Sequence, residues 1–133
     1  MDHLNVGNNA PIKLRVSVQT EAMAVTSGFI YHSETDEMPY SRMEPFDPSL
    51  KTGWKSLDKG NEVGGKVFRV ITFFTFFNSF PNEETFNLAV AQIKGSYIAE
   101  ISGGNPSPFP ISFTTEAFFT TQTCMVESGL KLL

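Results

Sequence analysis

The sequence contains one cysteine, Cys124, among its 133 residues. No disulfide can form within the chain, which excludes the small secreted scaffolds that depend on several bridges. The first residues lack the basic region and apolar stretch of a secretory signal, so we expect a cytoplasmic or otherwise soluble protein without a classical signal peptide. The longest apolar run is interrupted by Arg69 and has about half the length that a membrane-spanning helix needs.

Basic residues are also scarce. The chain has 10 Lys and Arg against 14 Asp and Glu, a formal net charge of −4, and no basic run. This balance disfavours unspecific binding to nucleic acid or to an anionic membrane, so we expect neither as a partner. An apolar fraction of 41% and a charged fraction of 18% are typical of a globular protein. We therefore expect a single domain over residues 1–133, and no motif indicates a cofactor.

Phenylalanine, by contrast, is abundant, with 13 Phe against 3 Tyr and 1 Trp. Phe offers apolar area without a hydrogen-bonding group, which favours dry contacts in a core, a pocket or a subunit interface. The segment 67–77 concentrates these residues, and as a strand it would be apolar on both faces. One face would present Val67, Ile71, Phe73 and Phe77, and the other Phe68, Val70, Phe74 and Phe76.

The second of these faces is expected to be covered. Leaving its four side chains in water would cost about 6–12 kcal/mol, which is comparable with the net stability of a domain, about 5–15 kcal/mol. The cover could be the chain's own loop over residues 33–53, a second subunit of a homo-oligomer, or an apolar small molecule inside a barrel. The residues predicted to form the interface are Phe68, Val70, Phe74 and Phe76.

Other segments also have strand patterns. Residues 12–19 alternate apolar and polar side chains, further signals follow at 25–31 and 97–101, and residues 111–121 form the last strong strand pattern. Residues 85–93 fit a strand or one face of a helix, and the turn signal at 94–96 favours the strand. The many Gly and Pro of residues 102–110 indicate a crossing loop. About seven or eight short strands predict an all-β antiparallel sandwich, with a small closed β-barrel as the alternative.

The segment 33–53 is a long irregular loop, and such loops are often functional. Aromatic and charged residues in and beside it could stack on a sugar or bind a peptide, although they could equally pin the loop to the sheet. The candidate binding residues are Tyr31, Tyr40, Arg42, Phe46, Asp47 and Trp54. The first hypothesis is therefore a non-catalytic binding or assembly module for a carbohydrate or protein partner, acting as a homo-oligomer. The second is a barrel that binds an apolar small molecule.

A third hypothesis is a small enzyme. His32, Glu34 and Asp36 alternate along the chain and could together hold a divalent metal or perform acid–base chemistry. Acidic residues in a Pro-rich loop are usually just solvated, so we predict no catalytic residue and no metal site. The segment 60–66 fits part of a phosphate-binding loop, but Val67 replaces the hydroxyl that would bind magnesium, and a strand follows instead of a helix.

Overall fold

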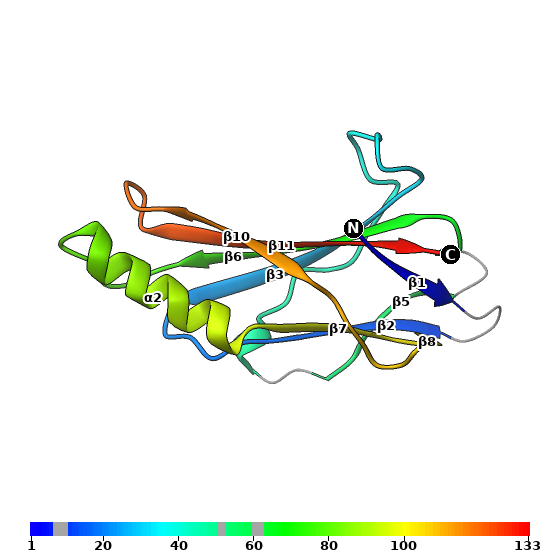
Figure 1. Ribbon diagram of the computed structural model, residues 1–133, viewed down its shortest axis with the longest axis horizontal. Helices are drawn as coiled ribbons and strands as arrows, with labels where there is room; N and C mark the ends of the chain where they lie inside the picture. Colours follow the sequence, from blue (N-terminus) through cyan, green and yellow to red (C-terminus); the bar gives the residue numbers. More distant parts are fainter. Residues whose placement is uncertain (7–10, 51–52, 60–62) are drawn as a thin grey trace.

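Two β-sheets lie face to face in the computed structural model, which describes residues 1–6, 11–50, 53–59 and 63–133 (Figure 1). The large sheet has seven strands and the small sheet has four, and they do not close into a barrel. The predicted all-β sandwich is confirmed, and the barrel alternative is wrong. Among the described residues, no helix is long and apolar enough to cross a membrane.

The large sheet is almost entirely antiparallel; only β1 and β11 run parallel. Its strands, in order across the sheet, are β4 (Ser41–Arg42), β3 (Met23–Tyr31), β6 (Val67–Thr75), β11 (Thr123–Leu132), β1 (Asp2–Val6) and β8 (Gly104–Asn105). A seventh strand, β10 (Phe113–Phe118), pairs with β11 on the same edge as β1. The small sheet consists of β5 (Lys55–Lys59), β2 (Pro11–Ser17), β7 (Ile98–Ser102) and β9 (Phe109–Pro110), and the helical elements are η1 (Pro48–Leu50) and α2 (Glu83–Ser96).

The Phe-rich segment forms β6, which lies between β3 and β11 and pairs with both along its whole length. Phe68, Val70 and Phe74 are fully buried, and Phe76 is partly buried against the same core. The small sheet and α2 lie on this inner face and cover it (Figure 1). The prediction that these four residues form a subunit interface is therefore corrected, because the cover comes from the chain itself.

The segment 85–93, for which we favoured a strand, belongs to helix α2. Asn82 caps its N-terminus, since the Asn82 Oδ1 accepts a 2.9 Å hydrogen bond from the Thr85 amide. Glu83 and Glu84 lie in the first turn, where acidic side chains favour the helix. Phe86, Val90 and Ile93 are buried at helical spacing, whereas alternation would have buried Leu88, which is exposed.

A chain of three hydroxyl groups crosses the core, and we call it the hydroxyl row. The Thr26 and Thr72 Oγ1 atoms are 2.7 Å apart, and the Thr72 Oγ1 lies 2.8 Å from the Tyr97 hydroxyl. All three residues are buried. Burial raises the pKa of Tyr97 to about 12, and the hydrogen bond to Thr72 offsets part of that effect. Because Tyr97 directly precedes β7, the row links the centre of the large sheet to the start of a small-sheet strand.

Gly103 lets the chain cross from the small sheet to the large one, between β7 and β8. Its φ is +97°, a conformation that L side chains rarely adopt. A Cβ atom at this position would also clash with the Pro11 carbonyl oxygen. The crossing predicted for residues 102–110 is therefore observed, with short edge strands β8 and β9 within it.

Candidate functional site

Three of the predicted binding residues, Tyr31, Tyr40 and Arg42, lie together where β4 pairs with the end of β3. Cations of the chain already lie over two of their rings. The Arg69 Cζ is 5.7 Å from the centre of the Tyr31 ring, and the Lys66 Nζ is 5.7 Å from the centre of the Tyr40 ring. Both distances are within the range of a cation–π interaction. The Tyr40 contact joins the loop to the residue that precedes β6, as the alternative interpretation expected, whereas the Tyr31 contact lies within the large sheet, between β3 and β6.

The other three predicted binding residues lie elsewhere. Phe46 exchanges two main-chain hydrogen bonds with Thr26 along the edge of β3, and the Asp47 Oδ1 accepts a hydrogen bond from the Ser49 amide. Trp54 lies beside the small sheet, where the Arg15 Cζ is 4.4 Å from the ring centre. The Arg15 guanidinium also binds the Glu100 carboxylate, at 2.5 Å. The six residues therefore do not converge on one site.

The proposed acid–base set does not converge either. The ring of His32 stacks on Tyr40, with 4.2 Å between the ring centroids, and Asp36 accepts a 3.0 Å hydrogen bond from the Ser33 hydroxyl. Glu34 is exposed. Within the described part of the chain, no group of three His, Cys, Asp or Glu could hold a metal ion.

Two further features of the sequence, the single cysteine and the phosphate-loop pattern, also provide no site. Cys124 is buried and has no disulfide partner, and burial raises the pKa of its thiol to about 11, which disfavours the reactive thiolate. Residues 60–62 of the phosphate-loop pattern lie outside the described residues. Its last residue, Lys66, leads directly into strand β6.

The feature that distinguishes the surface is a group of exposed apolar side chains on the outer face of the large sheet, which we call the outer patch. The face lies opposite the small sheet and α2 (Figure 1). The exposed members are Met23 (50%), Val25 (42%), Phe73 (53%), Phe77 (73%) and Phe118 (39%).

Strand register brings the members of the outer patch side by side. Phe73 pairs with Val25 of β3 on one side and with Met125 of β11 on the other. The neighbouring row joins Met23, Thr75, Thr123 and Phe118 across four strands. The first row is apolar throughout, and the second has two threonines between its apolar ends. Exposed apolar side chains grouped in this way typically mark a contact surface.

Charged residues flank the outer patch without giving the face a strong net charge. Glu116 pairs with Met125 across β10 and β11, and the Arg69 Nη1 lies 3.8 Å from the Glu127 Oε1. Lys131 occupies the far end of β11, opposite Val67. Arg42 of β4 also lies on this face, because it pairs with Phe29 beside Arg69. Two acidic and three basic side chains therefore share the face, so its net charge is small and it presents little repulsion to a surface of the same composition.

Sequence reasoning noted this face of segment 67–77 but assigned the interface to the other one. The sequence of β6 itself indicates which of its two faces is exposed to water. Arg69 and Thr75 share the face of Phe73, which marks the side that meets water, whereas the opposite face contains only Thr72 as a polar residue. Comparison with protein-family models, curated proteins and solved structures found no match for the chain. The functional argument therefore depends on geometry alone.

Proposed function

We propose that the protein is a non-catalytic assembly module that binds a second copy of itself through the outer patch. The observation that carries this proposal is the row of Val25, Phe73 and Met125, which forms the middle of an apolar strip on three adjacent strands. A two-fold dimer would bring the same strip of two copies together, and an apolar surface is complementary to itself. The small net charge around the strip is compatible with the same arrangement.

The size of the face sets the expected strength. Strands β3, β6, β11 and β10 lie side by side, and β3 and β6 have nine residues each. With strands ~4.8 Å apart and a rise of ~3.3 Å per residue, the face measures roughly 15 by 30 Å. That is smaller than the ~800 Å² that each partner buries in a standard interface. The proposal therefore predicts a weak, concentration-dependent dimer.

A carbohydrate partner has less support. Sugar recognition needs accessible ring faces together with polar groups that match the sugar hydroxyls. Tyr31 and Tyr40 each hold a cation of the chain over the ring, and Trp54 holds Arg15. The outer patch has the opposite composition, with apolar side chains at its centre and charges only at its margin.

Sedimentation velocity of the purified chain from ten micromolar to one millimolar tests the proposal. Burying the exposed half of Phe73 should contribute about 1 kcal/mol on each copy, so Phe73→Ser should weaken the dimer about 30-fold. Ile98→Ser is the matched control, because Ile98 is 52% exposed but lies on the outer face of the small sheet. A wild-type chain that stays monomeric at one millimolar, or equal effects of the two substitutions, would contradict the proposal.

A further inference from the structure

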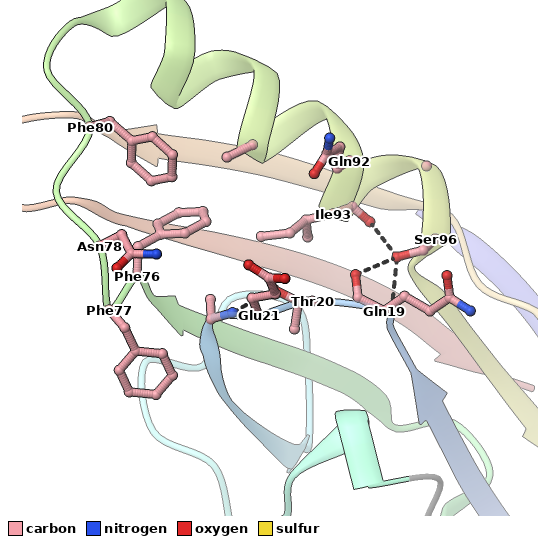
Figure 2. Close-up of a pocket in the computed structure, with 13 residues that line it drawn as sticks. Gln19, Thr20, Glu21, Phe76, Phe77, Asn78, Phe80, Gln92, Ile93 and Ser96 are labelled. Atoms are coloured by element: carbon pink, nitrogen blue, oxygen red, sulfur yellow. Dashed lines mark hydrogen bonds between the residues drawn. The ribbon is translucent and has the colours of Figure 1, made fainter.

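A cleft of about 750 Å³ opens between the C-terminal half of α2, the connection from β2 to β3, and the segment that joins β6 to α2 (Figure 2). Its apolar lining residues are Ala22, Phe76, Phe77, Phe80, Ala89 and Ile93. Small-molecule sites typically have volumes of about 300–1,000 Å³ and a predominantly apolar lining. The volume of the cleft is therefore within the range of sites that bind a small organic molecule.

The walls of the cleft are held by contacts within the chain. The Ser96 hydroxyl accepts a 3.0 Å hydrogen bond from the Gln19 amide and donates to the Gln19 carbonyl oxygen at 3.1 Å, which ties the end of α2 to the β2–β3 connection (Figure 2). On the opposite side, the rings of Phe76 and Phe80 meet edge to face, with centroids 5.1 Å apart. A ligand would therefore meet a largely preformed site, which lowers the entropy lost on binding.

The cleft carries negative charge. Glu21 is the only ionisable side chain among its lining residues, and Figure 2 shows its carboxylate directed toward Phe76 and Ile93. Within the described residues, the Glu21 side chain makes no hydrogen bond or ion pair. Gly95 and Ser96, at the C-terminal end of α2, also line the cleft, and this end of a helix has a partial negative charge. Both contributions attract a cation.

We propose that the cleft is a binding site for a small organic cation, with an aromatic or aliphatic body and an ammonium group. The body packs against Phe76, Phe80 and Ile93, and the ammonium group pairs with the Glu21 carboxylate. The open, solvated position of Glu21 limits the electrostatic contribution, so selectivity for the cation is modest. The site lies on the side of the large sheet that α2 covers, and the only residue that it shares with the outer patch is Phe77, whose ring points away from Phe76 and Ile93 (Figure 2).

Three compounds of similar shape test this proposal: 2-phenylethylamine, 2-phenylethanol and 3-phenylpropionate. Each is titrated into isotopically labelled protein at low salt, and binding is followed from amide chemical shifts. We expect shift changes at residues 19–22 and 92–96, with the amine binding about tenfold more tightly than the carboxylate and the alcohol between them. Glu21→Gln should weaken binding of the amine about three- to fivefold and leave that of the alcohol unchanged.

Two control variants make the outcome decisive. Glu84→Gln removes the same charge from the first turn of α2, outside the cleft, and should leave all three affinities unchanged. Ala89→Trp should fill the cleft and abolish binding of all three compounds. Equal affinities for amine and carboxylate, amine binding that is insensitive to Glu21→Gln, shift changes outside the cleft, or no saturable binding by ten millimolar would each overturn the proposal.

Discussion

Replacing Thr72 by valine should show that the hydroxyl row acts as one linked network. Thr72 is buried at the centre of β6, and its hydroxyl is shared with the hydroxyls of Thr26 and Tyr97. Valine preserves the β-branched shape but removes both hydrogen bonds. The Tyr97 hydroxyl then loses the partner that the structure gives it, while the Tyr97 ring keeps its edge contacts with Phe74 and Phe113.

The magnitudes follow from which hydroxyls are left without a partner. A buried unsatisfied polar group costs about 1–3 kcal/mol, and Thr72→Val leaves two of them, so it should lower the free energy of unfolding by about 2–6 kcal/mol. Tyr97→Phe removes only the end of the row, and Thr72 keeps its bond to Thr26, so a loss of about 1 kcal/mol is expected. The double variant should be more stable than Thr72→Val alone by about 1 kcal/mol, because the orphaned tyrosine hydroxyl is gone.

Urea unfolding followed by the fluorescence of Trp54 and by circular dichroism measures all three variants. The decisive quantity is the change in the free energy of unfolding that Tyr97→Phe causes in the Thr72→Val variant, and in particular whether it is a gain or a loss. If Tyr97→Phe lowers stability by the same amount in the Thr72→Val variant as in the unmodified chain, the two effects are additive, and the reasoning from a shared network fails. A difference in the slope against urea would show instead that the unfolded states are not comparable.

Two further predictions concern the corner of the fold and its response to alkali. Gly103→Ala should lower the free energy of unfolding by about 2–4 kcal/mol in urea titrations, because Gly103 has a positive φ and its Cβ would clash with Pro11. Gly95→Ala is the control: a Cβ at this position in α2 meets open space, so the free energy of unfolding should rise by up to about 1 kcal/mol. Equal effects of the two substitutions would contradict the account of the crossing. Between pH 10 and about 12 the folded chain keeps the Tyr97 proton that the unfolded chain releases. The contribution of Tyr97 to stability should therefore be fully present below pH 10 and fall by up to roughly 2–3 kcal/mol as the pH rises. Tyr97→Phe should remove this part of the pH dependence of unfolding, and an unchanged pH dependence in that variant would refute the prediction.

The local alternation of side chains was sufficient to predict a strand where the same residues pair in one of the two sheets. The alternation of residues 12–19 matches β2, and the extended interpretation of residues 67–77 matches β6. The residues of segment 85–93 fit a strand or one helix face, and the prediction of a strand was wrong because residues 94–96 were interpreted as a turn, whereas they form the last turn of α2. The evidence that decides for a helix is the cap at Asn82. At short range the two periods overlap, and the capping interaction decides between them.

Long-range placement could not be derived from the residues in the same way. β1 is held by pairing with β11 at the opposite end of the sequence, so the residues around Leu4 do not by themselves predict a strand. The candidate site failed for a related reason. Tyr40 and Trp54 are close in sequence but directly precede strands of different sheets, β4 and β5, and only the packing of those sheets shows that they are apart. The outer patch was within reach of the sequence, through Arg69 and Thr75, because side-chain alternation in one strand is a local property.

The central position of β11 has a consequence for the order in which a nascent chain can fold. β3 precedes β6 in the sequence, so one edge of β6 can pair as soon as β6 is synthesised. The other edge can pair only after residues 123–132, which form β11, have been synthesised. Until those residues leave the ribosome, a Phe-rich strand has an open edge and a face without its full sheet, which is the state most prone to pair with other chains. We therefore expect the large sheet to be completed late and slowly, with chaperone demand concentrated in that interval.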